Sequence, residues 1–235
     1  MNVIDVRNIS KTIGKSKLIN DISFKIDSGN IIGLVGRNGA GKTTLMKCLT
    51  GLLEVETGSI NICTYDINKE KSSALKHVGA SIEMPMFYPE LTGYDNLRAF
   101  SENKKNIAYV IEYIGLKNDI LRKVGTYSLG MKARLMVGIA LLNNPELLIL
   151  DEPTNGLDPS GIIELRNILC RLKDEGKTII ISSHILSEIE KICDEIYFIC
   201  GGEIFKKVKI GAKNVDLEKI YNEVERKYDE KRYLC

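Results

Sequence analysis

The feature that most constrains the fold of this chain is a glycine-rich segment between an apolar run and a helix-like run. Gly36-x-x-x-x-Gly41-Lys42-Thr43 directly follows the apolar residues 31–35, which are typical of a parallel strand buried on both faces. The glycines allow the backbone to curl so that successive N–H groups point inward at an anion. The start of the following helix adds unpaired donors and a favourable dipole. The segment therefore predicts a phosphate-binding loop.

The side chains of this loop suggest roles at a nucleotide. Lys42 would reach the β- and γ-phosphates, and the hydroxyl of Thr43 would bind Mg²⁺. The other residues expected to surround the phosphates are Gly36, Asn38, Gly39, Ala40, Gly41 and Thr44. A glycine-rich turn without a ligand is the alternative, and the strand, helix, lysine and threonine around it argue against that alternative.

Two acidic residues, Asp151 and Glu152, follow the apolar run 147–150. Burying two carboxylates at the end of a strand is costly unless a cation or hydrogen bonds compensate. Phosphoryl transfer depends mainly on positioning and charge stabilisation, so one base, one metal ion and a few donors suffice. A helix-capping acidic pair before Pro153 is the alternative, but it leaves the upstream phosphate loop unexplained.

Hydrophobic periodicity divides the rest of the chain into elements. Alternation over residues 1–30 predicts antiparallel strands that are interrupted at Gly14 and at Ser28-Gly29. Short apolar runs predict buried strands, and a 3.6-residue period predicts helices. The expected strands are 31–35, 78–82, 147–150 and 178–181, and the expected helices are 43–53, several within 85–144, one between 150 and 178, and one over about 216–227.

Bulk properties exclude several classes of protein. A formal net charge of +2 gives no indication of nucleic-acid binding. The start of the chain does not have the regions of a signal peptide, and no apolar run approaches the roughly 20 residues that span a bilayer. The six cysteines include no Cys-x-x-Cys pair, which argues against a zinc site and a disulfide scaffold and for reduced thiols.

Six short segments occur in a fixed order along the chain, within a resemblance that spans roughly residues 1–202. They are the phosphate loop 36–43, Glu83, Tyr127-Ser128-Leu129-Gly130-Met131, the run 147–150 with Asp151-Glu152, Leu157-Asp158, and Ser183-His184. Together they resemble the nucleotide-binding subunit of ABC transporters. The resemblance implies an α/β fold: a P-loop NTPase core with a mixed sheet, an N-terminal antiparallel β-subdomain and a helical signature subdomain.

The resemblance also implies domain boundaries. The whole chain, 1–235, would form a single ATP-binding domain. Residues 1–84 and 145–205 would form the core with its β-subdomain, and residues 85–144 the helical subdomain. Residues 206–235 would be a short C-terminal tail with a helix and no regulatory domain.

Roles for the acids and the histidine follow from the same resemblance. Asp151 would hold the Mg²⁺ shell, Glu152 would polarise or deprotonate the attacking water, and His184 would contact the γ-phosphate. Ser128 and Gly130 would face the ATP of a second subunit, and Asp158 would touch that subunit's phosphate loop. A head-to-tail homodimer with two ATP molecules at the interface is therefore expected. Taken alone, a serine before a helix is more often an N-cap, but the spacing of Ser128 ahead of Asp151-Glu152 favours the role at the second subunit.

Besides Leu129 and Met131, which depart from the family's signature sequence, two residues differ from the usual family pattern in ways that bear on the site. Glu83 stands where a glutamine is usual, and a carboxylate binds Mg²⁺ more strongly than an amide, so Glu83 is expected to be a catalytic residue and a metal ligand. This substitution resembles the subgroup that handles lantibiotics, bacitracin and related peptide antibiotics. Ile13 takes the place of an aromatic side chain that often stacks on adenine, so weak discrimination between ATP and GTP is expected.

The function implied by the resemblance is ATP hydrolysis that energises an exporter of a peptide antibiotic, for resistance or immunity. ATP and Mg²⁺ would be the cofactors. The partners would be a separate transmembrane permease and a second ATP-binding subunit, and the chain would lie in the cytoplasm at the inner face of the cell membrane. The alternatives are the ATPase of another ABC-2-type exporter and a soluble ABC ATPase that acts on ribosomes or DNA.

Overall fold

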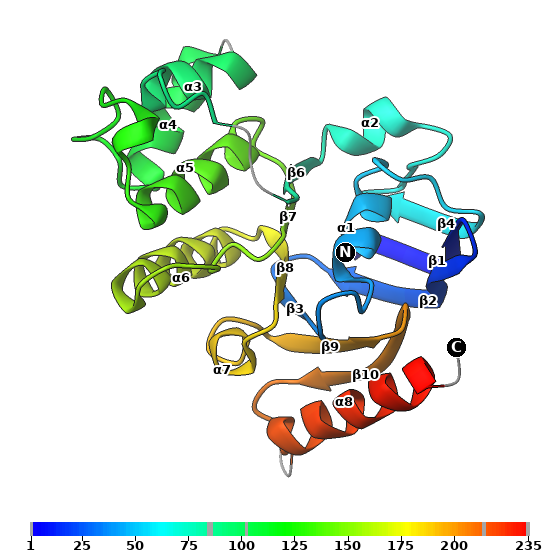
Figure 1. Cartoon of the computed structure of the whole chain (residues 1–235). Helices are drawn as coiled ribbons and strands as arrows, with labels where there is room; N and C mark the ends of the chain where they lie inside the picture. The colour runs from blue at the N-terminus through cyan, green and yellow to red at the C-terminus, as the bar shows by residue number, and fades with distance from the viewer. Residues whose placement is uncertain (1, 84–86, 102, 213–214, 234–235) are drawn as a thin grey trace.

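Two β-sheets form the framework of the chain (Figure 1). The structure is a computed structural model and describes residues 2–83, 87–101, 103–212 and 215–233. The first sheet has the strand order β2-β1-β4-β5, and the second has the order β10-β9-β3-β8-β7-β6. The strands of the first sheet are β1 (Asn2–Ile13), β2 (Ser16–Asp27), β4 (Thr57–Ile62) and β5 (Tyr65–Asp66).

The first sheet is antiparallel throughout, as the alternating sequence predicts. Its two long strands β1 and β2 are joined at Gly14, which has a φ of 61° that glycine adopts without steric cost. Alternate residues such as Ile4, Val6, Ile22 and Phe24 are buried on one face. That face packs on the phosphate-loop helix α1 (Lys42–Leu49) through residues such as Leu45 and Leu49.

The second sheet carries the strands at whose carboxyl ends the functional residues lie. Its strands are β3 (Ile31–Val35), β6 (Val78–Ser81), β7 (Leu147–Leu150), β8 (Thr178–Ser183), β9 (Glu195–Cys200) and β10 (Glu203–Lys209). β3 pairs in parallel with β8 and β9, and β7 pairs in parallel with β6 and β8. Every residue of β3, β7 and β8 is buried. The apolar runs of these three strands are continuous because both faces of the sheet are covered there, so that no side chain of these strands faces solvent.

The helical region predicted for residues 85–144 projects from the two sheets (Figure 1). Its elements are α3 (Gly93–Phe100), α4 (Lys104–Tyr113), the short 3₁₀ turn Val124–Thr126 and α5 (Leu129–Leu141). Thr92 caps α3 by accepting a hydrogen bond from the Asp95 N–H. Buried Leu97, Ile107 and Leu135 join the three helices into one apolar core. The boundary expected between residues 84 and 85 lies outside the described residues.

Several elements end differently from expectation. The helix expected over 43–53 ends at Leu49, because Thr50 donates its hydroxyl to the Met46 carbonyl and Gly51 adopts a φ of 63°. The strand expected over 178–181 continues through Ser182 and Ser183. This extension brings two buried hydroxyls to the edge where the acids of β7 lie.

The C-terminal segment is integrated into the second sheet. The boundary expected between 205 and 206 falls inside β10, which pairs antiparallel with β9. Helix α8 (Leu217–Tyr233) runs alongside these strands (Figure 1) and buries Leu217, Ile220 and Val224 in the core. Helices α2 (Lys71–Leu75), α6 (Pro159–Asp174) and α7 (Leu186–Ile189) complete the fold. Among the described helices, none combines the length and the apolar character needed to cross a membrane.

Candidate nucleotide-binding site

The glycine-rich loop connects the end of β3 to the start of α1, as predicted. Gly36 is packed so closely that a Cβ there would collide with the Ile199 carbonyl oxygen, and Gly41 has a φ of 110° that other residues rarely adopt. The buried Lys42 folds back over the loop and donates from Nζ to the Gly36 carbonyl at 2.6 Å and to the Arg37 carbonyl at 3.3 Å. The loop is thus preformed around the lysine ammonium.

A chain of three oxygen-bearing side chains lies beside this loop. The Thr43 hydroxyl donates to Asp151 Oδ2 at 2.8 Å, and the Ser182 hydroxyl donates to Asp151 Oδ1 at 2.5 Å. The Asp151 backbone is fixed by its N–H, which donates to the Ser81 carbonyl at 2.9 Å. Burial of Asp151 is therefore compensated by hydrogen bonds to both carboxylate oxygens. These hard oxygen donors are of the type that Mg²⁺ takes in proteins.

Glu152 lies between the phosphate-loop lysine and the histidine. One carboxylate oxygen is 3.6 Å from Lys42 Nζ, and the other is 2.9 Å from His184 Nδ1. Glu152 has a positive φ of 48°, and its N–H donates to the Ser182 hydroxyl at 2.8 Å. A non-glycine residue held at positive φ is a strained conformation that often occurs at functional sites. The structure thus brings Lys42, Thr43, Asp151, Glu152 and His184 together.

Glu83 points to α1. Its carboxylate pairs with Lys47 Nζ at 2.5 Å, and its side chain is 62% exposed. Lys47 follows Thr43 by four residues, so the two lie on the same face of α1. Glu83 also has a positive φ of 61°. The ion pair therefore holds Glu83 next to the helix face that carries Thr43, and its role as a metal ligand stays a prediction.

The residues expected to serve a second subunit lie together at the starts of two helices. Ser128 caps α5 by accepting a hydrogen bond from the Met131 N–H at 3.2 Å, and Asp158 caps α6 by accepting one from the Gly161 N–H at 3.0 Å. A Cβ at Gly130 would lie 3.6 Å from the Gly161 Cα, so the two helix starts are neighbours. Capping and contact with a second subunit are compatible, because an oxygen accepts more than one hydrogen bond.

The remaining residues predicted for the site differ in exposure. Asn38 and Gly39 are exposed at the tip of the loop, Thr44 is half-buried on α1, and Ala40 is buried below the loop. Ile13 ends β1 with 51% of its surface exposed. An exposed aliphatic side chain offers contact area to a base without the stacking geometry that an aromatic ring provides.

We expect ATP and GTP to compete for this site because Ile13 provides no aromatic ring for base stacking. The KM values of hydrolysis for the two nucleotides should lie within about tenfold of each other, and an Ile13→Tyr variant should bind both more tightly, since an aromatic contact is worth about 0.5–1.5 kcal/mol. Steady-state kinetics with each nucleotide measures this. A hundredfold preference for ATP in the unaltered chain would contradict the expectation.

Sequence reasoning did not identify two residues of the site. Ser182 binds both Asp151 and the Glu152 backbone, and the only sequence signal was a polar residue directly after the apolar run 178–181. Arg37, to which no role was given, pairs with Glu225 at 3.2 Å and with Asp229 at 2.8 Å on α8. A contact between positions 192 residues apart cannot be inferred from local patterns.

The phosphate loop lies between a parallel strand and a helix, and acids and a histidine lie at the ends of the neighbouring strands. This arrangement defines a P-loop nucleotide hydrolase with a helical insert. Sequence comparison matches residues 19–155, more than half of the chain, to the family described as ABC transporter. The chain belongs to this family, whose ATP-binding cassettes bind nucleotide and hydrolyse ATP.

Individual relatives agree with this assignment. The chain is 43% identical to the lantibiotic transport ATP-binding protein SrtF of Streptococcus pyogenes, over 94% of this chain and 96% of that protein. It is 42% identical to the bacitracin transport ATP-binding protein BcrA of Bacillus licheniformis, over 88% of this chain and 69% of that protein. An ATP-binding cassette of an ABC transporter, solved in its ADP conformation, superposes with a TM-score of 0.84 at 26% identity, over 96% of this chain and 98% of that one.

Proposed function

We propose that this chain hydrolyses Mg²⁺-bound ATP to energise an exporter of peptide antibiotics. The observation that carries the proposal is the position of the Glu152 carboxylate between Lys42 Nζ and His184 Nδ1. A base at this place is next to the group that would bind the γ-phosphate, which suits activation of an attacking water. The backbone N–H groups of the loop and the Lys42 ammonium would stabilise the charge on the phosphates.

Thr43 and Asp151 are the residues that would hold Mg²⁺, with Glu83 as a further candidate. The 2.8 Å hydrogen bond between the Thr43 hydroxyl and Asp151 places two hard oxygens side by side beside the loop. Mg²⁺ would supply charge neutralisation of the β- and γ-phosphate oxygens. Ser182 would keep Asp151 oriented, since it donates to the second carboxylate oxygen.

We further propose that two copies of the chain form each complete site. The phosphate loop packs against the β9–β10 turn, Glu152 and α8, whereas Ser128 and Gly130 adjoin the start of α6. The start of α5 offers N–H groups and a positive dipole end, which suit a phosphate provided by another molecule. A head-to-tail pair would bring the α5 start of each copy to the loop of the other.

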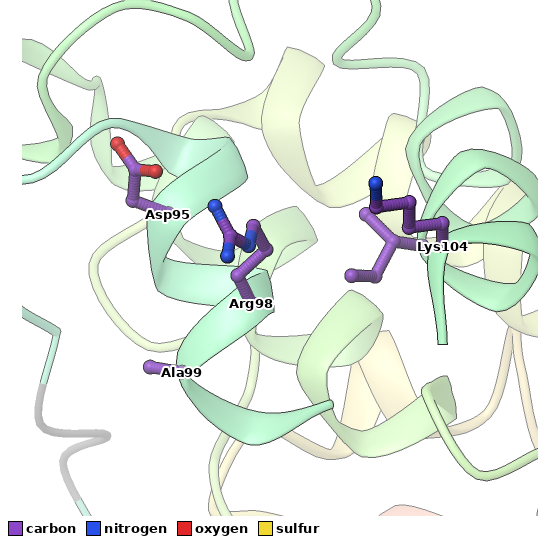
Figure 2. A pocket seen from close by; sticks show the side chains of 5 residues that line it. Asp95, Arg98, Ala99 and Lys104 are labelled. Carbon is purple, nitrogen blue, oxygen red and sulfur yellow. The ribbon is translucent and has the colours of Figure 1, made fainter. Parts of the chain in front are cut away.

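The helical region would bind the permease and so hold the chain at the inner face of the membrane. A cavity of about 440 Å³ lies between α3 and α4 and is lined by Asp95, Arg98, Ala99, Lys104 and Ile107. Figure 2 shows the side chains of Arg98 and Lys104 on the two helices that border it. Exposed Leu91 and Phe100 lie at or near the ends of α3. Apolar and charged groups around one hollow suit the docking of a short amphipathic segment. Glu83, which pairs with Lys47 on α1, precedes this helical region in the sequence.

Peptide antibiotics are the proposed cargo because of the relatives named for lantibiotic and bacitracin transport. Glu83, which resembles the residue of that subgroup at this place in the sequence, supports the same cargo. Gentle solubilisation of membranes with ATP and Mg²⁺, followed by identification of proteins that co-purify with the tagged chain, tests the proposal. A multi-span membrane protein is expected. Ribosomes or nucleic acid in its place would overturn the proposal and leave only ATP hydrolysis.

The docking surface has its own test. We expect Arg98→Glu to reduce the amount of co-purified permease several-fold, because it reverses a charge at the cavity, while the isolated chain hydrolyses ATP at an unchanged rate. Lys219→Glu on α8 is the matched control and should retain the permease. Equal recovery with both variants would remove the α3–α4 cavity from the interface.

A further inference from the structure

Three side chains with metal-binding atoms meet away from the nucleotide site. Cys63, His77 and Glu146 each offer one ligand atom, and these atoms all lie within 4.8 Å of one another. They come from three segments: the turn between β4 and β5, the residue before β6, and the residue before β7. The lack of a Cys-x-x-Cys pair argued against a zinc site, but spacing along the chain does not detect ligands that only the tertiary structure brings together.

Backbone hydrogen bonds hold each of the three residues in place. The Cys63 N–H donates to the Val3 carbonyl at 2.9 Å. The His77 carbonyl accepts from the Leu147 N–H at 3.0 Å, and the Glu146 carbonyl accepts from the Thr178 N–H at 2.9 Å. Because these bonds belong to or extend the strand pairing of the two sheets, the three Cα positions are set by the rigid part of the fold.

The side chains are oriented as well as gathered. His77 Nδ1 lies 2.9 Å from Glu146 Oε2. The His77 ring stacks on Tyr65, with ring centroids 5.5 Å apart and planes 16° from parallel. Cys63 and His77 are half-buried, and Glu146 is exposed. A cation could therefore enter from solvent, while the stacked ring restricts the imidazole to one orientation.

We propose that Cys63, His77 and Glu146 form a binding site for a divalent cation of the zinc class. Thiolate, imidazole and carboxylate are the three ligand types that Zn²⁺ takes, and water would complete a tetrahedral set. On binding, the Cys63 thiol loses its proton to solvent and the sulfur bonds to the metal. Mg²⁺ and Ca²⁺ prefer oxygen ligands, so the sulfur and nitrogen atoms favour a softer ion.

The bound cation would join the edges of the two sheets. Cys63 belongs to the β4–β5 edge of the four-stranded sheet, whereas His77 and Glu146 precede β6 and β7 of the six-stranded sheet. A link between residues 63 and 146 closes a long loop of chain, and such links stabilise a fold by restricting the unfolded state. The site would then have a structural role that is separate from ATP hydrolysis.

Co²⁺ spectroscopy on the full chain tests the proposal. After removal of metals with a chelator, titration with Co²⁺ should produce a thiolate-to-cobalt charge-transfer band with a stoichiometry of one ion per chain. Cys63→Ser should abolish the band, and Cys170→Ser, which alters a half-buried cysteine on α6, should retain it. A Co²⁺ ion at Asp151 gives no such band, because the partners of Asp151 are hydroxyl groups.

A second measurement keeps the test decisive if Cys63→Ser folds poorly. His77→Gln and Glu146→Gln should each weaken Zn²⁺ binding at least about tenfold and should therefore reduce the rise in Tm that Zn²⁺ gives the unaltered chain. Absence of the charge-transfer band in the unaltered chain, or its persistence in Cys63→Ser, would overturn the proposal. The His77–Glu146 pair would then be a hydrogen bond next to a protonated thiol.

Discussion

Replacing Glu152 with Gln is expected to stop ATP turnover while the chain still binds ATP. The amide keeps the size of the side chain but cannot accept a proton from the attacking water, and such a loss lowers a rate about 10²–10⁴-fold. The Thr43–Asp151 pair and the contacts of Lys42 with the loop carbonyls are unaffected. Because ATP would remain intact, the proposed head-to-tail dimer should accumulate, which phosphate release and size-exclusion chromatography with ATP measure together.

A matched substitution at an exposed glutamate controls this experiment. Glu54, which is exposed in the segment after α1, should give normal turnover and no trapped dimer when it is changed to Gln. Undiminished hydrolysis in Glu152→Gln would remove Glu152 from its proposed role. If hydrolysis is lost but no dimer accumulates, Glu152 would still be the base, but the proposal that two copies of the chain form each site would be contradicted.

Replacing Lys42 with Ala is expected to weaken ATP binding about 10- to 150-fold, since a hydrogen bond to a charged group contributes about 1.5–3 kcal/mol. The buried ammonium donates hydrogen bonds to the Gly36 and Arg37 carbonyls of the phosphate loop. The phosphates of ATP would bind the same ammonium in place of these carbonyls. Removal of Lys42 therefore changes both the conformation of the loop and the affinity for ATP. Equilibrium binding of a fluorescent ATP analogue measures the affinity, and circular dichroism checks that the variant is folded.

The control for Lys42 is a lysine in an exposed ion pair. Lys117 pairs with Glu112 at 3.4 Å, and both side chains are more than 70% exposed. Such pairs contribute about 0–1 kcal/mol to stability, so Lys117→Ala should bind ATP normally. An ATP affinity of folded Lys42→Ala equal to that of Lys117→Ala would show that the loop binds phosphate without its lysine.

Local patterns predicted the elements that depend on few neighbours. The alternation of β1 and β2, the buried strand before the phosphate loop and the stripe of α6, with Leu165, Ile168 and Leu169 buried, are confirmed. Element ends were less predictable. α1 stops at Leu49 because of a hydroxyl-to-backbone bond and a glycine at positive φ, and β10 forms only because β9 is available for pairing.

The sequence predicts the chemistry of the nucleotide site, since the phosphate loop, the acid pair and the histidine each lie next to a recognisable strand. Which atoms meet depends on the tertiary structure. Three contacts join segments that are far apart in the chain. They are the hydrogen bond of Ser182 to Asp151, the ion pairs of Arg37 with α8, and the cluster of Cys63, His77 and Glu146. Side-chain periodicity records only which face of an element is buried, whereas a contact between distant segments depends on sheet order and register.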